Sequence, residues 1–231
     1  GKYLGRIGGA GAYSFDFVQT VTCGEGGAIV TNDAQTYTAL DAYSDHGHDH
    51  KGADRGADQH PLLGYNFRIS ELHAAVGLAQ MRRLQEFLDL QKKNYAVIKE
   101  ALSSVPQLTF RKLPDESGDS CGSISWFLPS EEKAKAVVAR LKEQNILAGN
   151  FYWYDNNWHY VRNWHHLKNI ATYNKLSPEQ IEALEKISSQ DFSASDYIMS
   201  RCITTNISLT WTEEQVKEKA EKLKSAIESV L

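Results

Sequence analysis

The chain has 231 residues, enough for one large or two small domains with a buried core. Its hydrophobic content of 42% and charged content of 23% are typical of a globular protein, and a net charge of −4 gives no reason to expect nucleic acid or an anionic membrane as a partner. No apolar run approaches the ~18 residues that a membrane span needs, so we expect no membrane association.

Three widely spaced cysteines, Cys23, Cys121 and Cys202, occur without CxxC spacing. An odd number of scattered cysteines predicts free thiols in a reducing compartment, so we expect a cytoplasmic protein. The chain opens without an initiating Met or a signal peptide, and we expect it to be the later part of a longer protein.

Residues 12–33 predict a β-hairpin around a glycine-rich bend. Tyr13, Phe15 and Phe17 alternate with polar residues, which is the period of a half-buried strand. The glycines of residues 24–27 can turn tightly, and a second strand follows at residues 28–30.

Asn32 or Asp33 is a plausible cap for a helix over residues 34–45. The periodicity is then lost over residues 46–64, which are rich in His, Gly and Asp and predict a long exposed loop. Alternating histidines can bind zinc, as in a zinc hydrolase, but the Asp in His46-Gly47-His48-Asp49-His50 comes one residue too early for the HxHxDH motif. We therefore favour solvated histidines and no metal site.

Ser70 caps a predicted helix whose apolar periodicity continues to Leu102, with a break or bend around residues 79–83. Such a helix could join two domains.

Beyond Pro106 the pattern predicts strands at residues 108–113 and 123–128, a helix at 130–144 and a strand at 146–152. This βαβ-like alternation favours a small α/β domain. Two capping-box patterns, at Ser177 and Thr212, predict further helix starts, and a strand is expected at residues 203–209.

Residues 151–166 read FYWYDNNWHYVRNWHH and concentrate aromatic side chains in one irregular segment. Amphipathic rings of this kind suit a ligand pocket or a subunit interface, and a packed loop explains them equally well.

Residues 14–33, SFDFVQTVTCGEGGAIVTND, resemble the active-site segment of the DegT-type sugar aminotransferases, which depend on pyridoxal 5'-phosphate (PLP). Residues 64–72, GYNFRISEL, look like that family's Gly-Tyr-Asn-Tyr-Arg-Met-Ser-Glu block. Gly5-Arg6-Ile7-Gly8 and the His46-Gly47 loop also fit the pattern. The resemblance covers the whole chain and is most specific between residues 5 and 80.

The resemblance implies an α/β fold of the aspartate-aminotransferase type, the fold type I of PLP enzymes. Residues 1–85 would be the C-terminal part of the PLP-binding large domain, and residues 86–231 the small C-terminal domain. The family's N-terminal portion, which carries groups that hold the cofactor ring, has no counterpart in these residues.

One departure concerns chemistry, because Gln19 occupies the place of the family's Schiff-base lysine. An amide is neither basic nor nucleophilic, so the chain as written is expected to be inactive. We favour an engineered Lys-to-Gln change. The alternatives are a natural PLP-dependent sugar dehydratase and a non-catalytic aminotransferase-like module.

Carried over by position, the cofactor-binding residues are Ser14, Gln19 and Asn66. Ser14 would hydrogen-bond the phosphate, and Asn66 would reach the phosphate of a neighbouring subunit, which implies a homodimer with shared active sites.

Candidate substrate residues are His46, Arg68, Tyr152, Trp153 and His159, with Arg68 able to fork onto a carboxylate.

The reaction that the resemblance implies for a lysine-bearing parent moves an amino group from glutamate to a keto-sugar. The aromatic segment and residues 195–201 look most like the family members that aminate 8-oxo-3-deoxy-manno-octulosonate for lipopolysaccharide biosynthesis. The sequence leaves open which sugar is used and whether a nucleotide is attached to it.

Overall fold

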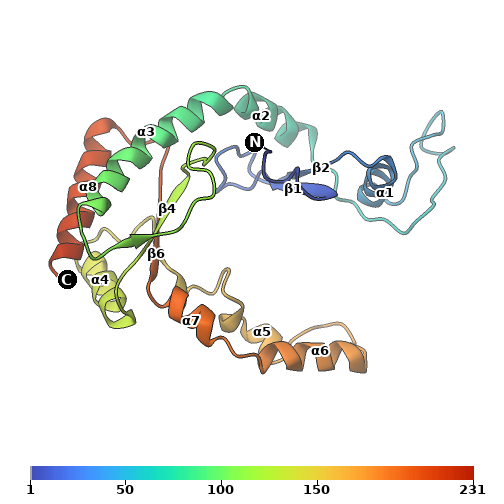
Figure 1. The fold of residues 1–231 in the computed structure, drawn as a ribbon. Helices are drawn as coiled ribbons and strands as arrows, with labels where there is room; N and C mark the ends of the chain where they lie inside the picture. Colours follow the sequence, from blue (N-terminus) through green and yellow to red (C-terminus); the bar gives the residue numbers. More distant parts are fainter. Residues whose placement is uncertain (1) are drawn as a thin grey trace. The chain divides into compact units, whose positions relative to one another are not determined.

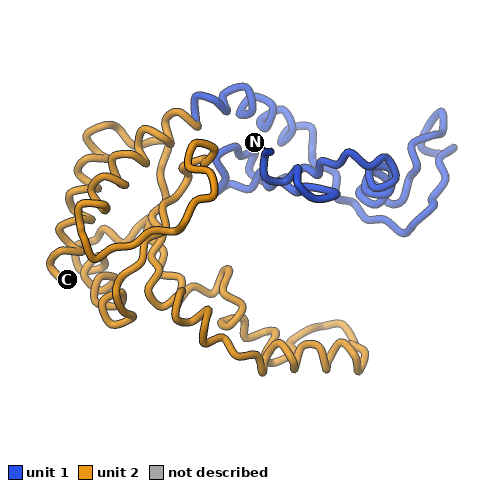
Figure 2. Tube along the Cα trace, in the orientation of Figure 1, with its two compact units in different colours: residues 1–87 blue, residues 88–231 orange. Residues whose placement is uncertain are grey.

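The computed structural model describes residues 2–231, and the chain divides into two compact units, Gly1–Phe87 and Leu88–Leu231 (Figure 2). The division falls inside helix α3 (Leu84–Ser103).

The first unit contains the expected hairpin, in which β1 (Ala10–Ser14) pairs antiparallel with β2 (Gly27–Thr31) (Figure 1). The expected alternation from Tyr13 to Phe17 is wrong, because β1 ends at Ser14 and Phe17 is 73% exposed. The backbone N–H groups of Asp16 and Phe17 bond to the side chains of Ser14 and Asp16, which turns the chain instead of extending the strand.

Side-chain caps start both helices of the first unit. Asp33 accepts from the Thr36 N–H at the start of α1 (Ala34–Ser44), and Ser70 accepts from the His73 N–H at the start of α2 (Glu71–Met81). The predicted break near residues 79–83 is confirmed, since α2 ends at Met81 and α3 begins at Leu84.

The sheet of the second unit has the order β3-β4-β6-β5, and each of these neighbouring pairs is antiparallel. Its strands are β3 (Thr109–Phe110), β4 (Ser123–Phe127), β5 (Asn150–Tyr152) and β6 (Cys202–Asn206). The expected βαβ alternation is present as a split unit. Strands β4 and β5 run parallel and are joined through α4 (Glu131–Glu143), but β6 lies between them and pairs with both.

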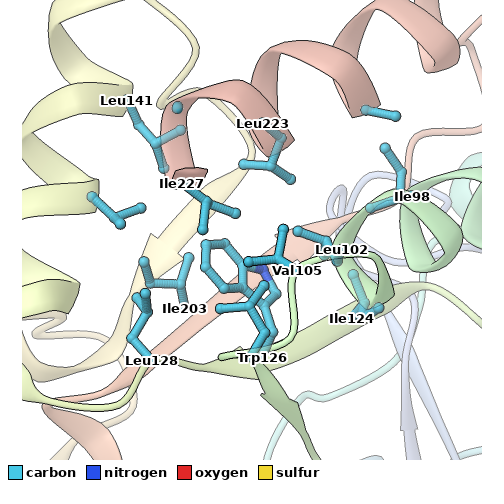
Figure 3. Close-up of a cluster of buried hydrophobic side chains, with 14 of the residues drawn as sticks. Ile98, Leu102, Val105, Ile124, Trp126, Leu128, Leu141, Ile203, Leu223 and Ile227 are labelled. Carbon is cyan, nitrogen blue, oxygen red and sulfur yellow. The ribbon is translucent and has the colours of Figure 1, made fainter. Parts of the chain in front are cut away.

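The hydrophobic core of the second unit is formed where α3, α4 and α8 (Glu213–Glu228) pack on the sheet (Figures 1 and 3). Trp126 on β4 is fully buried, and its Nε1–H donates to Thr205 Oγ1 at 3.0 Å. Around it lie Leu102, Ile203 and Ile227, one from each of three elements. Burial of side chains of this size contributes roughly 1.5–3 kcal/mol each, so this cluster is the main source of the second unit's stability.

The rest of the second unit consists of short helices: η1 (Trp153–Asp155), η2 (Val161–Asn163), α5 (His165–Lys168), α6 (Pro178–Ser188) and α7 (Ser193–Met199). Both predicted capping boxes are confirmed, at Ser177 for α6 and at Thr212 for α8. Across residues 2–231, no helix has the length and apolarity needed to cross a membrane.

Candidate functional site

Ser14 and Gln19 lie on the same short turn at the end of β1. Ser14 Oγ accepts from the Asp16 N–H at 3.2 Å, and the Asp16 carbonyl accepts from the Gln19 N–H at 3.0 Å. Both side chains are exposed. The turn thus presents a hydroxyl and a carboxamide from positions five residues apart.

The glycine bend holds this turn against the segment that leads into α2. Gly26 has φ of +154°, and a Cβ placed there would lie 2.8 Å from Ile69 Cδ1, so only glycine fits. Cys23 is buried beside Gly77 of α2. The bend and α2 therefore hold the turn in place, and Ile69 lies three residues after Asn66.

His46, Asn66 and Arg68 are brought together by backbone pairing between residues 43–46 and 65–67. The His46 N–H donates to the Tyr65 carbonyl at 2.9 Å, and the Phe67 N–H donates to the Ser44 carbonyl at 2.9 Å. This pairing closes the long loop of residues 47–64 at its base.

A group that we call the Asp45 cluster comprises Asp45, His46, His50, Arg55 and Arg68. Asp45 is only 6% exposed, and its carboxylate accepts two hydrogen bonds from Arg55, at 3.1 and 2.9 Å. It also accepts from Arg68 and lies 3.2 Å from His50 Nε2. Burial alone would raise the pKa of Asp45, but hydrogen bonds from Arg55, His46 and His50 outweigh it and hold that pKa well below its usual range.

The Asp45 cluster limits what Arg68 can do. Its guanidinium already pairs with Asp45 and lies 3.1 Å from His46 Nδ1, so a substrate carboxylate would compete with Asp45 for it. Asp45, His50 and Arg55 were not predicted. The only hint in the sequence was that the His-rich loop also carries Arg and Asp.

Within residues 2–231, no three His, Cys, Asp or Glu side chains are grouped as ligands of a metal ion.

The remaining predicted residues belong to the second unit. Tyr152 is buried and donates its hydroxyl hydrogen to the Ser200 carbonyl at 2.8 Å, and burial raises the pKa of Tyr152. Trp153 Nε1–H donates to Thr204 Oγ1 at 2.7 Å. The exposed ring of His159 lies 4.8 Å from the ring of Trp158. Among the three predicted residues, His159 is thus the one most open to a ligand.

The same segment forms a surface pocket of about 480 Å³ that was not predicted residue by residue. Its walls are Asn157, Trp158, Asn163, Trp164, His165 and His166.

The residues of the first unit fit one part of PLP and not another. The Ser14 hydroxyl and the Asn66 carboxamide are neutral donors of the kind that bind a phosphate group. The Gln19 carboxamide cannot form the covalent bond that a lysine amine forms with an aldehyde. The donor set therefore suits a phosphate, and position 19 does not suit covalent attachment.

Several curated proteins are similar in sequence to parts of this chain. The lipopolysaccharide biosynthesis protein RfbH of Salmonella typhimurium is 31% identical over 164 residues, covering 62% of this chain and 37% of the relative. GDP-perosamine synthase of Escherichia coli O157:H7 is 32% identical over 108 residues, covering 47% of this chain and 29% of the relative. The chain thus matches well under half the length of these relatives.

Solved structures share the fold over nearly all of the chain. Helicobacter pylori PseC, described as an aminotransferase involved in the biosynthesis of pseudoaminic acid, superimposes with a TM-score of 0.71 at 18% identity, covering 99% of this chain and 56% of PseC. Escherichia coli GDP-4-keto-6-deoxy-D-mannose-3-dehydratase, solved with bound hydrated PLP, gives 0.67 at 19% identity, covering 98% and 56%. This establishes the fold as that of the fold type I PLP enzymes. A model of the DegT/DnrJ/EryC1/StrS aminotransferase family matches residues 1–224, and the chain therefore belongs to that family of PLP-dependent enzymes.

Proposed function

We propose that this chain is the scaffold of a PLP-dependent sugar aminotransferase, in which residues 1–85 complete the cofactor-binding large domain and residues 86–231 form the small domain. In a lysine-bearing parent the reaction moves an amino group from glutamate to a keto-sugar. The observation that carries the proposal is the turn with Ser14 and Gln19, held by the glycine bend against the segment that follows Asn66.

Ser14 and Asn66 are the proposed phosphate-binding residues, with Asn66 acting on the phosphate held by a second copy in a homodimer. Bound PLP supplies the aldehyde group that accepts and returns the amino group. Asn66 Oδ1 accepts from the Arg68 N–H at 3.3 Å, which orients its Nδ2 away from that bond as a donor.

Gln19 makes the chain as written inactive under this proposal. The lysine would attach the cofactor and move the proton at the reacting carbon, and Gln19 can do neither. No other residue is proposed as a replacement base.

The proposed acceptor is a keto-sugar used for lipopolysaccharide, specifically 8-oxo-3-deoxy-manno-octulosonate. The names of the relatives RfbH and GDP-perosamine synthase support a sugar pathway of this kind. His46, Arg68, Tyr152, Trp153 and His159 remain the proposed substrate residues, and Arg68 would exchange Asp45 for a substrate carboxylate.

A second candidate is a PLP-dependent sugar dehydratase, favoured by a relative named GDP-4-keto-6-deoxy-D-mannose 3-dehydratase from Yersinia pseudotuberculosis, 30% identical over 165 residues. A dehydratase would not convert glutamate to 2-oxoglutarate in proportion to the amino-sugar formed. Measuring 2-oxoglutarate in an active Gln19→Lys form separates the two reactions.

Covalent attachment of PLP tests the proposed function directly. The full chain, its Gln19→Lys variant and a Gln19→Arg control are incubated with PLP, reduced with borohydride and mapped by peptide mass spectrometry. We expect one reduced cofactor at position 19 of Gln19→Lys alone, because arginine carries charge without a nucleophilic amine. Equal labelling of surface lysines in all three proteins, with none at position 19, would contradict the proposal.

A further inference from the structure

We propose that the pocket formed by Asn157, Trp158, Asn163, Trp164, His165 and His166 is a saccharide-binding site, which we call the indole pocket. This inference rests on the proposed function, because it assigns a binding site to the sugar that the proposed reaction uses. The pocket is a depression widely open to solvent, with a volume of about 480 Å³.

The segment that carries the indole pocket is fixed to the rest of the second unit. Asn163 Nδ2 donates to the carbonyls of Tyr154 and Asn156, at 2.9 and 3.2 Å, and so ties the two sides of the segment together. Arg162 Nε lies 3.0 Å from a carboxylate oxygen of Asp196 on α7, which also accepts from the buried Tyr160 hydroxyl. The wall at Asn163 is therefore preorganised, which lowers the entropy cost of binding there.

Four of the five indole groups of this unit fall into two kinds. Trp126 and Trp153 donate their Nε1–H groups to the hydroxyls of Thr205 and Thr204 on β6. Trp158 and Trp164 line the pocket, and the hydrogen bonds that they donate among the described residues come from their backbone N–H groups, to Asn156 Oδ1 and to the Val161 carbonyl. Their indole Nε1–H groups are thus available to donate to a ligand.

Each of these two indoles is stacked on a histidine. The Trp158 and His159 rings lie 4.8 Å apart at 17°, and the Trp164 and His166 rings lie 5.8 Å apart at 27°. Each indole offers a flat apolar surface together with a polar edge, and its contact with the histidine restricts its orientation.

The chemistry of the walls selects the ligand class. No Asp, Glu, Lys or Arg lines the pocket, so its walls suit the uncharged part of a ligand, and a carboxylate or phosphate of the same ligand would lie outside the pocket in solvent. The Asn157 carboxamide and the two imidazoles can donate and accept hydrogen bonds, as hydroxyl groups require. Asn163 offers its Oδ1 as an acceptor, because its Nδ2 hydrogens are bonded to the carbonyls of Tyr154 and Asn156. A sugar ring presents an apolar C–H face and a rim of hydroxyls, and these match indole faces rimmed by amides.

Two further observations favour this pocket over the residues first predicted from the sequence. The polar atoms of Tyr152 and Trp153 are occupied by Ser200 and Thr204. Trp158 is 54% exposed, and Asn157 is exposed beside it. A sugar can reach these side chains without breaking any hydrogen bond of the sheet.

The experiment measures quenching of tryptophan fluorescence in the full chain as it stands, without cofactor. The probes are 3-deoxy-D-manno-octulosonate as a free sugar, GDP-mannose as a nucleotide-linked sugar, and GDP alone. We expect saturable quenching by at least one sugar probe and none by GDP. The sugar probe whose quenching saturates shows whether the pocket binds a free sugar or a nucleotide-linked sugar.

Trp158→Ala and Trp164→Ala should each weaken the apparent Kd by about tenfold, which corresponds to ~1.4 kcal/mol. Trp158→Phe keeps an aromatic face and should lose less than Trp158→Ala. Trp211→Phe is the matched control, since Trp211 lies beside Lys219 and outside the pocket. Circular dichroism of each variant checks its fold.

Absence of quenching by both sugars, or equal Kd values in all of the variants, would overturn the indole pocket as a saccharide site. Because binding is read without PLP, this result is independent of attachment at position 19. Sugar binding with no labelling of Gln19→Lys would retain the pocket and remove the proposed reaction.

Discussion

At the scale of single residues, the buried polar contacts of β6 show how the core tolerates hydroxyl groups. Thr205 is fully buried, accepts from Trp126 Nε1–H and donates to Asn150 Oδ1 at 2.6 Å. One hydroxyl thus satisfies two buried partners on neighbouring strands.

Thr205→Val should destabilise the second unit by about 1–3 kcal/mol, because it leaves an indole N–H and a carboxamide oxygen buried without partners. The shape of the side chain is nearly unchanged, so the loss reports hydrogen bonding. Urea unfolding followed by tryptophan fluorescence measures it, with the exposed Thr210→Val as the control. A loss no larger than that of the control would show that water or a rearrangement satisfies both groups.

Gln19 departs from a family motif that the neighbouring residues otherwise match, and this one change removes the reactive amine. The turn that carries it is held by backbone bonds and by the glycine bend, and none of these contacts uses the Gln19 side chain as a structural element. Changes at this position should therefore alter chemistry with little effect on the fold, which is why Gln19→Lys is an informative variant.

At the scale of elements, the Asp45 cluster attaches the His-rich loop to the end of α1. His50 Nδ1 lies 2.7 Å from Asp41 Oδ2, and His50 Nε2 lies 3.2 Å from Asp45 Oδ2. The hydrogen bond with Asp41, and then that with Asp45, raise the pKa of His50 above its ordinary value. The protonated ring therefore bridges two carboxylates.

The attachment of this loop should weaken with rising pH. A raised pKa in the folded state means that the contribution of His50 is complete below the unfolded value of ~6.5 and is lost as pH rises through the higher folded pKa. Limited proteolysis between residues 47 and 64 should accelerate over that interval. In His50→Gln the rate should lose this pH dependence, and an unchanged pH profile in the variant would contradict the assignment.

Elements with local signals were predictable from the sequence. The caps at Ser70, Ser177 and Thr212 and the break after Met81 depend on neighbours a few residues away, and all four are present. The insertion of β6 between β4 and β5 was not predictable, because it depends on contacts between segments about 50 to 80 residues apart.

The residues of the candidate site also divide into those that the local sequence predicts and those that depend on contacts between distant segments. The motif residues Ser14, Gln19, Asn66 and Arg68 could be named from their order in the chain. The pairing of Arg68 with Asp45, 23 residues earlier, and the closure of the indole pocket depend on loop conformations that no periodic pattern encodes. The strand expected at Tyr13 to Phe17 failed because Asp16 turns the chain locally.

At the scale of the whole molecule, the two units are built differently. In the second unit, α3, α4 and α8 contribute fully buried side chains to one cluster. In the first unit, α2 buries none of its residues and α1 buries only Ala42. The first unit is therefore held chiefly by backbone pairing, glycine contacts and the Asp45 cluster, and it should open more readily.

The modification rates of the three buried thiols report how readily each of the two units opens. Cys23 lies under α2 in the first unit, whereas Cys121 and Cys202 lie in the second, where burial raises the pKa of Cys202 to about 11. A maleimide reagent should modify Cys23 first, at a rate set by transient exposure, and Cys202 last. Mass spectrometry of timed samples resolves the order without any mutation, and modification of Cys202 ahead of Cys23 would reverse the ranking of the units.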